Sequence, residues 1–436
     1  MLRARKVYRV GRGLDVEIGG TPVQHIDEVR GATGSVALLS DDFVGQQLSP
    51  LVQVGDRVRL AEPLAVDLDR PRIHHTSPGA GVVREVLLGE RRRLVSIVVD
   101  LDGDDEVRFD ATPTSALASL DPEDVKERLV ASGLWTALRA RPFDRVPDPA
   151  TSPRSVFVTA TDTTPLSADA EVVLARDPER FVDGLRVVAH LTRGPVFVCS
   201  RRGAALPIGE VDRVNLVEFA GPHPAGLVGT HVHRLDPVGP GRTVWHLGYQ
   251  DVQAIGTLFT TGRVATERIV SLGGPMVARP RLIRTRLGAC TDDLVCGELR
   301  SGDCRVISGS PLSGRQTSGW GRFLGRYHAQ VCVLPEGAPA ERRRPFGRRP
   351  PSTTTALHGR PTVFFPSGVH ERVIPLDLQA TPLLRALLVG DTAKAQALGC
   401  LELAEEDLAL ATYVCPGKLE YGEHLRAALE RIAREG

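Results

Sequence analysis

The chain lacks the closely spaced cysteines that usually hold iron–sulfur clusters. Its 436 residues include seven cysteines, and no two of them form a Cys-x-x-Cys pair. Because cluster ligand sets usually include such pairs, a cluster is disfavoured. An odd number of scattered cysteines also argues against a disulfide framework and fits a reducing compartment.

Glycine-rich phosphate-binding motifs are also missing. The sequence contains neither a GxGxxG motif after a strand-like run nor a phosphate loop that ends in Gly-Lys-Ser or Gly-Lys-Thr. The fragments Gly11-Arg12-Gly13 and Gly79-Ala80-Gly81 are isolated and typical of turns. NADH and flavins need backbone amides around their phosphates, so we expect this chain to bind neither directly.

Long apolar runs and an excess of charge are lacking as well. No run of about 18 apolar residues occurs, so no transmembrane segment is predicted. The 54 basic and 53 acidic residues leave a net charge of +1, which predicts no general attraction to nucleic acid. The basic N-terminus has no apolar stretch of signal-peptide length. We therefore expect a cytoplasmic protein that reaches a membrane only through partners.

What the sequence does contain indicates several domains, because about 100–200 residues is the usual domain size. Residues 50–100 read as short β segments broken by turns, typical of a small sandwich or barrel. The phrases VGDRVRLAEPL and TSPGAGVVREV resemble the two halves of a biotinyl or lipoyl carrier. A carrier presents a lysine on the hairpin between them, where this chain has Asp69, Arg70 and Pro71. We expect that fold without its covalent chemistry.

The remaining sequence predicts helices, an α/β layer and a small β-rich unit in turn. Asp121 and Pro122 begin a helix whose apolar spacing continues towards Arg141. From about 155 to 265, apolar strand-like runs alternate with helical stretches, which favours a partly parallel sheet. The expected fold is a multidomain α/β protein with a biotinyl/lipoyl-like β domain (1–110), connecting helices (111–150), a Rossmann-like α/β domain (151–265), a β-grasp domain (266–334), an Arg/Pro-rich linker (335–380) and a C-terminal helical domain (381–436).

A glycine-rich segment from Gly221 onward concentrates three of the twelve histidines: His223, His231 and His233. In a strand, His231 and His233 would point to the same side, which makes a metal site geometrically feasible. No acidic or cysteine ligand, however, lies close enough in sequence to favour a metal site. We therefore favour a structural loop with locally hydrogen-bonded histidines and predict no metal.

Two segments offer the residue types that a quinone site needs, namely apolar and aromatic side chains with a donor for the carbonyl oxygens. Either segment could instead be ordinary packing. If the helix that starts at Pro122 continued to Arg141, Trp135 and Arg139 would lie four apart on one face. The candidate residues are Leu39, Phe43 and Val44 in LLSDDFVG, and Trp135, Arg139, Arg141 and Phe143 in SGLWTALRARPF.

Several long phrases, FAGPHPAGLVGTHVH and VCPGKLEYG above all, resemble the A subunit of the sodium-translocating NADH:quinone reductase. The resemblance runs over nearly the whole chain in the family's order, and is poor at about 335–370. It implies a peripheral subunit on the cytoplasmic face of the bacterial inner membrane, docked on the other subunits, especially the membrane-embedded, flavin-bearing B subunit. The enzyme couples NADH oxidation and ubiquinone reduction to sodium export.

The resemblance also implies how cofactors are divided within the enzyme. NADH, FAD, FMN and iron–sulfur chemistry would belong to partner subunits. This chain would carry no flavin or cluster and would have ubiquinone as ligand or substrate. The implied fold is similar to the flavin subunit of complex I and the C subunit of the Rnf complex, with an SLBB-like β-grasp domain. Cys415 stands alone near the place where those relatives bind a cluster.

Two alternative interpretations remain at this point. One is an electron-input subunit of the Rnf or complex I type, which carries flavin and iron–sulfur. The missing glycine and cysteine motifs argue against it. The other is a biotin or lipoyl carrier, against which the missing lysine argues. The arginines at 342–344, 348 and 349 could contact anionic lipid or RNA, but a solvated basic loop is the usual explanation.

Overall fold

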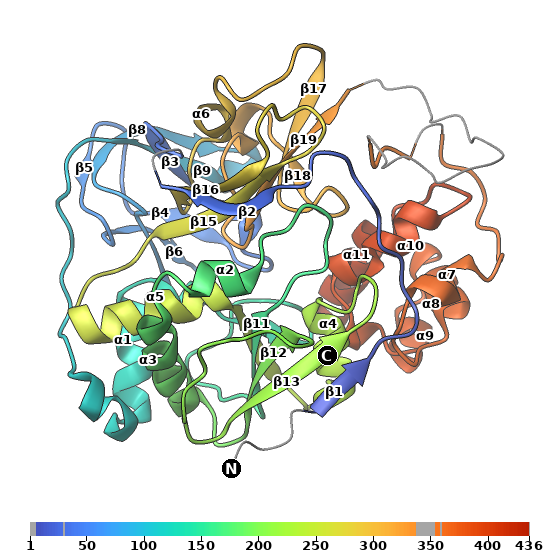
Figure 1. Ribbon diagram of the computed structural model, residues 1–436, viewed down its shortest axis with the longest axis horizontal. Coiled ribbons are helices and arrows are strands. Elements are labelled where there is room, and N and C mark those ends of the chain that lie inside the picture. The colour runs from blue at the N-terminus through green and yellow to red at the C-terminus, as the bar shows by residue number, and fades with distance from the viewer. Residues whose placement is uncertain (1–5, 29–30, 337–353, 358–359, 436) are drawn as a thin grey trace.

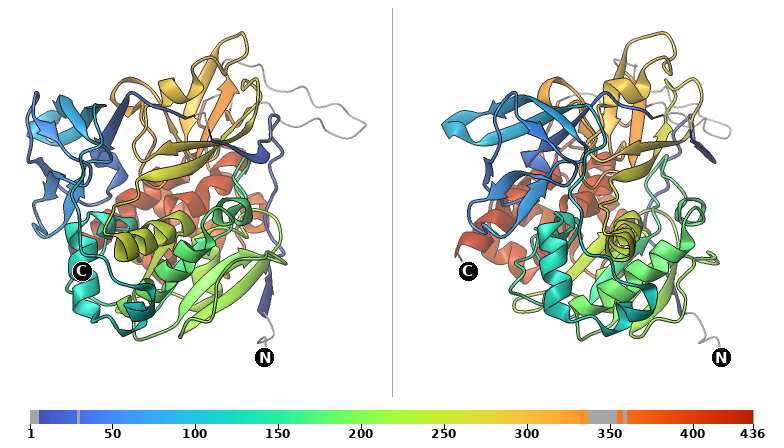
Figure 2. Two further views of the ribbon diagram at one scale, coloured as in Figure 1. Left: turned by 60° about the vertical axis from the view of Figure 1, so that its left-hand side comes forward. Right: turned by 90° about the vertical axis from the view of Figure 1, so that its left-hand side faces the viewer.

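The computed structural model describes residues 6–28, 31–336, 354–357 and 360–435. Figures 1 and 2 show four regions in contact: two β-rich regions, an α/β region and a helical C-terminal region. The basic stretch at 342–349 lies outside the described residues.

The α/β region contains a six-stranded sheet with helices on both faces. Its strand order is β1-β13-β12-β11-β14-β10, and all neighbours are parallel except β14 and β10. Alternate residues of a strand point to opposite faces. Val156 and Val158 accordingly join the core of α3 and α5, whereas Phe157 joins that of α4. The elements are β1 (Lys6–Arg9), β10 (Arg139–Arg141), β11 (Val156–Ala160), β12 (Val196–Arg201), β13 (Val214–Ala220), β14 (Val244–Gly248), α2 (Ala170–Leu174), α3 (Pro178–Val188), α4 (Val228–Leu235) and α5 (Tyr249–Thr261).

A second six-stranded sheet, with one short helix, forms the β-grasp-like region. Its strand order is β18-β17-β19-β15-β16-β2. The prediction of short strands around a single helix is confirmed for residues 266–334. The elements are β2 (Val23–Asp27), β15 (Glu267–Gly273), β16 (Arg281–Arg286), β17 (Cys304–Ser308), β18 (Arg315–Gln316), β19 (Gln330–Pro335) and α6 (Thr291–Val295).

Two small antiparallel sheets make the N-terminal β region, as the turn-rich sequence predicts. One has the order β3-β9-β8-β5 and the other β4-β6-β7. The hairpin between β6 and β7 carries Asp69, Arg70 and Pro71, and Arg70 donates to Asp67 at 2.9 Å. The strands are β3 (Ser35–Leu39), β4 (Leu48–Pro50), β5 (Arg57–Val58), β6 (Pro63–Asp67), β7 (His74–Thr76), β8 (Gly81–Leu88) and β9 (Leu94–Leu101).

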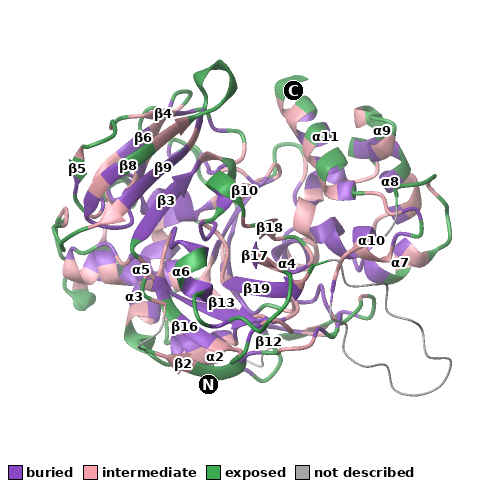
Figure 3. Ribbon diagram, turned by 90° about the horizontal axis from the view of Figure 1, so that it is seen from above, coloured by how far each residue is buried: buried purple, intermediate pink, exposed green. Residues whose placement is uncertain are grey.

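The C-terminal region is a group of helices that face their buried residues inward (Figure 3). It comprises α7 (Val369–Val373), α8 (Ala380–Leu388), α9 (Thr392–Ala397), α10 (Ala409–Val414) and α11 (Tyr421–Glu435). Since α7 lies within 335–380, that stretch is not linker throughout.

Three expectations differ from the structure. β1 and β2 lie outside the N-terminal β sheets, because they pair with β13 and β16 across long sequence separations.

The helix at 122, α1 (Pro122–Ala131), begins as predicted, with the Asp121 side chain accepting from Glu123 N. It ends ten residues before Arg141, because Gly133 adopts a left-handed φ of 77°, which stops a helix. Arg139 therefore lies in strand β10, and Trp135 and Arg139 do not share a helical face.

Candidate functional site

A large cleft opens at the carboxyl ends of β11 and β14. The chain runs from β11 through β12 to β13 on one side of the sheet and returns to β14 on the other. Such a reversal is the topological switch point at which open α/β sheets bind ligands. The cleft, with a free volume of about 570 Å³, is lined by residues of the α/β region, the β-grasp-like region and the C-terminal region. We call it the switch-point cleft.

The cleft wall is rich in charges that are paired. Arg139 donates to Asp144 at 2.7 Å and lies over the Tyr327 ring, 4.5 Å from its centre. Asp144 also faces His246 at 2.7 Å. Burial raises the pKa of the Asp144 carboxyl, but Arg139 and Arg141 more than offset this and hold it well below its usual range. Burial, with Arg139, lowers the pKa of His246 to about 4, so this histidine is neutral at pH 7.

Arg141 is fully buried and joins β10 to the C-terminal helices. Its guanidinium contacts Asp144 at 3.0 Å, Asp407 at 3.1 Å and Glu406 at 3.4 Å. Glu406 and Asp407 belong to the 3-10 helix Glu405–Leu408. Burial raises the pKa of Glu406 to about 7, and Asp407 repels it in the same direction. We call Arg141, Asp144, Glu406 and Asp407 the Arg141 cluster.

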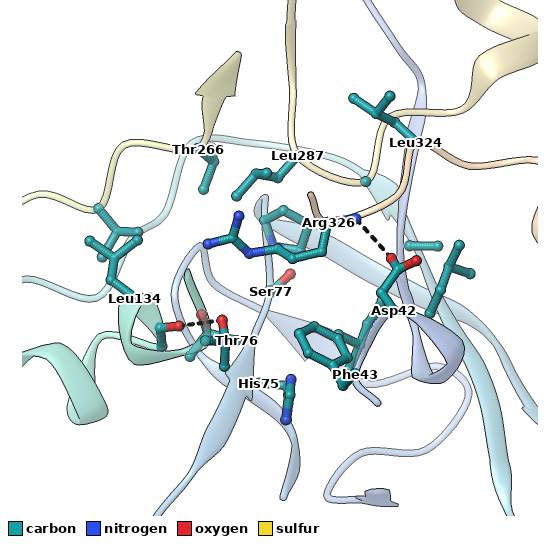
Figure 4. A pocket seen from close by; sticks show the side chains of 18 of the residues that line it. Asp42, Phe43, His75, Thr76, Ser77, Leu134, Thr266, Leu287, Leu324 and Arg326 are labelled. Carbon is teal, nitrogen blue, oxygen red and sulfur yellow. Dashed lines mark hydrogen bonds between the residues drawn. The ribbon is translucent and has the colours of Figure 1, made fainter. Parts of the chain in front are cut away.

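A second, smaller cavity adjoins the switch-point cleft, and the two share Asp42 and Arg326 as lining residues. We call it the Phe43 pocket. Its free volume of about 60 Å³ exceeds the roughly 10–15 Å³ that one water needs. Its wall comes from β3 and the turn after it, β7, residues 132–136 after α1, and segments at 264–288 and 324–326 (Figure 4).

The Phe43 pocket has a mixed lining of apolar side chains and hydroxyl groups, and two of its polar side chains are unusual. Phe43 meets His75 edge to face, with ring centres 4.1 Å apart. His75 is 2% exposed, and neither ring nitrogen has a hydrogen-bond partner among the described residues. Burial, and secondarily Arg326, lowers the pKa of His75 to about 3, so its ring is neutral. Figure 4 shows the Arg326 guanidinium reaching into the pocket, on the side away from Asp42.

The structure divides the seven predicted quinone residues among three places. Leu39 and Phe43 line the Phe43 pocket, and Val44 and Arg139 line the switch-point cleft. Neither cavity is lined by the other three. Trp135 is fully buried with its Nε1 donating to Pro147 O at 2.8 Å, Arg141 is in the Arg141 cluster, and Phe143 packs against the C-terminal helices.

His75 and Arg326 were not among the residues predicted from the sequence to form a site. His75 falls in a predicted β segment, where an inward position between half-buried His74 and Thr76 is the only signal. Arg326 is one of many arginines, and only the fold brings it to the same cavity as Phe43.

The loop predicted for His231 and His233 is instead helix α4, so these two side chains point in different directions and not to the same side as in a strand. His231 Nε2 contacts Ala225 O at 3.0 Å, and His233 Nδ1 contacts Glu402 at 2.7 Å. His223 Nδ1 faces the Thr163 hydroxyl at 3.0 Å. In the part of the chain that the structure describes, no group of three or more His, Cys, Asp or Glu residues is arranged to hold a metal ion.

None of the helices in the described residues is both long and apolar enough to cross a membrane.

Comparison with known proteins assigns three parts of the chain to family models. Residues 8–102 match the NqrA N-terminal barrel-sandwich hybrid domain, 120–264 the NqrA second alpha/beta domain, and 269–319 the NQRA C-terminal domain of SLBB type. The architecture is therefore multidomain α/β, with a barrel-sandwich hybrid, a second α/β domain, an SLBB domain and a helical C-terminal part.

Full-length relatives agree with the domain matches. The chain is 50% identical to the A subunit of the Na(+)-translocating NADH-quinone reductase from Pseudomonas aeruginosa strain UCBPP-PA14, over 99% of this chain and 100% of the relative. The same coverage is found at 48% identity for the A subunit from Cellvibrio japonicus and at 47% for that from Yersinia pestis. A solved NAD+-reducing [NiFe]-hydrogenase is similar at 15% identity, with a TM-score of 0.38, 74% of this chain and 64% of that chain covered. The identity and coverage of these full-length relatives show that the chain belongs to the family of A subunits of the Na+-translocating NADH-quinone reductase, a sodium-transporting respiratory enzyme.

Proposed function

We propose that this chain binds the quinone of the reductase, and that the quinone ring lies in the Phe43 pocket. The observation that supports this most is the pair of donors, His75 and Arg326, in a cavity whose other walls are apolar side chains, five hydroxyl residues and Asp42. A quinone is a flat apolar ring with two carbonyl oxygens that only accept hydrogen bonds. Phe43 offers a ring contact, and Leu39, Leu134 and Leu324 offer apolar walls.

The unpartnered state of His75 gives this assignment its energetic reason. A buried polar group without a partner costs roughly 1–3 kcal/mol. A neutral imidazole has one N–H, and a guanidinium has five. Among the described residues, the Arg326 side chain makes one hydrogen bond, from Nη1 to Asp251 at 3.1 Å. Two quinone oxygens would give His75 and Arg326 the acceptors they lack.

The switch-point cleft is a poor place for a flavin phosphate. In α/β sheets of this kind, a phosphate binds at a helix N-terminus beside the cleft. At α4, a Cβ built on Gly229 would overlap Asp407 Oδ1, so the Asp407 carboxylate occupies the space against the first turn. We infer that this chain holds no flavin or iron–sulfur cluster, and that NADH, FAD, FMN and iron–sulfur chemistry takes place in other subunits.

The remaining parts of the proposal follow from membership of a membrane-bound reductase. The chain is peripheral on the cytoplasmic face and docks on the membrane-embedded, flavin-bearing B subunit. A direct test of the NADH assignment uses the purified full chain with NADH and a dye acceptor. Dye reduction by the pure chain would contradict it.

Quinone binding is tested with the full chain and a short-chain ubiquinone in equilibrium dialysis. Phe43→Ala removes the ring contact, worth about 0.5–1.5 kcal/mol beyond buried area, so binding should weaken by roughly tenfold. Val44→Ala is the matched control, because Val44 is the adjacent residue but lines the other cavity. Circular dichroism checks folding. Equal affinity of wild type and Phe43→Ala would overturn the assignment.

A further inference from the structure

Five charged side chains meet at the boundary between the Phe43 pocket and the switch-point cleft. Arg315 Nη1 donates to Asp42 Oδ1 at 2.9 Å. Arg268 Nη2 and Arg326 Nη1 both donate to Asp251 Oδ1, at 2.5 and 3.1 Å. Among these five side chains, three guanidinium groups face two carboxylates, so the group itself carries one net positive charge. Two further arginines line the cleft, and each is paired: Arg139 with Asp144 and Arg426 with Glu405.

Arg326 is the member of this group that carries the excess charge into the pocket. Its backbone N–H donates to Asp42 Oδ2 at 2.8 Å, which fixes the start of the side chain. The guanidinium then points towards Leu134 and Thr266 (Figure 4), and the side chain is 10% exposed. At that burial, water and salt screen the charge only weakly. A ligand in the Phe43 pocket therefore experiences a positive potential.

We propose that Arg326 is a catalytic residue, which stabilises the anion formed when the quinone in the Phe43 pocket takes up its first electron. This inference rests on the proposed function. The first step adds one electron to the neutral ring and breaks no bond. A second electron and two protons then complete the quinol. Both electrons come from NADH through the other subunits, as the activity of the reductase requires.

The physical basis is that charge develops only in the product of the first step. Neutral quinone gains a hydrogen bond from Arg326, whereas the anion gains a full charge–charge interaction with a guanidinium that is only 10% exposed. A preorganised group aimed at developing charge favours the charged state over the neutral one. Asp251 is a positioning residue with an opposite electrostatic effect, because its carboxylate partly cancels the charge of Arg326.

The test is a redox titration of the assembled reductase, with electron paramagnetic resonance reporting the one-electron-reduced quinone. Arg326→Gln should weaken binding of the anion relative to the neutral quinone by at least tenfold, which lowers the midpoint potential of the first electron by about 59 mV. Asp251→Asn should raise that potential, because it removes a compensating negative charge. Arg322→Gln is the control, since Arg322 is half exposed on the same segment and its side chain donates to Gly319 O.

The outcomes separate this inference from the proposed function. If quinone binds but neither Arg326→Gln nor Asp251→Asn shifts the potential relative to Arg322→Gln, the role of Arg326 is overturned and the site stands. If Phe43→Ala leaves quinone affinity unchanged, the site itself is wrong. Should Arg326→Gln fail to fold, the upward shift expected for Asp251→Asn still decides the question.

Discussion

The Arg141 guanidinium lies 3.1 Å from the Asp407 carboxylate, although 266 residues separate the two in the sequence. Arg141 and Asp407 are each 1% exposed at the side chain. Burial lowers the pKa of Arg141, but Asp144, Asp407 and Glu406 more than offset this, so the net shift is upward. The Arg141 cluster therefore joins β10 of the α/β sheet to the C-terminal helices through a buried guanidinium and its carboxyl partners.

Replacing Arg141 should be severely destabilising. Arg141→Ala leaves Asp407 buried without its cationic partner and Asp144 with Arg139 alone, and breaking a buried ion pair in this way costs about 3–5 kcal/mol. Urea denaturation at pH 7 measures the loss. Arg431→Ala is the control, because Arg431 pairs with Glu435 on the exposed face of α11 and should leave the midpoint unchanged. Equal midpoints for the two variants would show that the cluster contributes nothing to stability.

The pH dependence of stability should include a contribution from Glu406. Its pKa in the folded state, about 7, is raised above the unfolded value, so the folded protein binds this proton more tightly. The resulting stabilisation is complete below about pH 4.5 and is lost as pH rises through 7. Glu406→Gln should therefore leave stability at pH 5 nearly unchanged and raise it at pH 8 by about 1–2 kcal/mol. Thermal unfolding at the two pH values checks this, and parallel pH profiles for both proteins would contradict it.

Local sequence signals predicted the parts of the fold that local interactions determine. Asp121 caps α1 as expected, because a carboxylate next to free N–H groups is favourable in any context. The start of α4 carried no such signal, since Leu227 offers no side-chain cap. α4 is instead held by packing, for example of Val228 and Val232 against Phe219. The pairing of β1 with β13 is also non-local and could not be predicted from either segment alone.

The site was predictable in part for the same reason. The aromatic and apolar character of Phe43 and Leu39 made them candidates for a ligand contact, and the structure places both in the wall of the Phe43 pocket. The partners of Phe43 in its pocket, His75 and Arg326, come from distant strands and loops, so only the tertiary structure shows them. Trp135 has equally suitable chemistry for contact with a quinone. Because α1 ends at Ala131, however, Trp135 lies buried in the core and lines neither cavity.

Gly229 should not tolerate a side chain. Alanine normally stabilises a helix position relative to glycine by up to about 1 kcal/mol. Here its Cβ would overlap Asp407 Oδ1, so the carboxylate must move away from Arg141. We expect Gly229→Ala to destabilise the protein by about 1–3 kcal/mol and to make the C-terminal helices more sensitive to proteolysis. Gly239→Ala is the control, because nothing lies within 4 Å of its Cβ position.

Replacing His223, His231 and His233 together with Gln should change stability and not metal content. His231 is buried against the Phe219 ring, with ring centres 4.2 Å apart, and its loss should cost about 1–3 kcal/mol. Each histidine already has a hydrogen-bonding partner in the fold. Elemental analysis should show background zinc in both proteins. Stoichiometric zinc in the wild type alone would restore the metal interpretation.

Trp135 and Phe43 should show opposite patterns of effect, which tests whether the segment around Trp135 contacts the quinone at all. Trp135 is fully buried, donates to Pro147 O at 2.8 Å and meets Trp245 edge to face, with ring centres 5.4 Å apart. Trp135→Phe removes the donor and leaves a buried carbonyl unpaired, so we expect a loss of about 2–4 kcal/mol in stability. Because Trp135 lines neither cavity, quinone affinity should be unchanged as long as the variant is folded.

Phe43→Ala should instead weaken quinone binding more than any other substitution of an apolar lining residue. Equilibrium dialysis and urea denaturation on the same preparations supply both values. A folded Trp135→Phe protein with affinity reduced as much as that of Phe43→Ala would place the quinone against Trp135 and away from the Phe43 pocket.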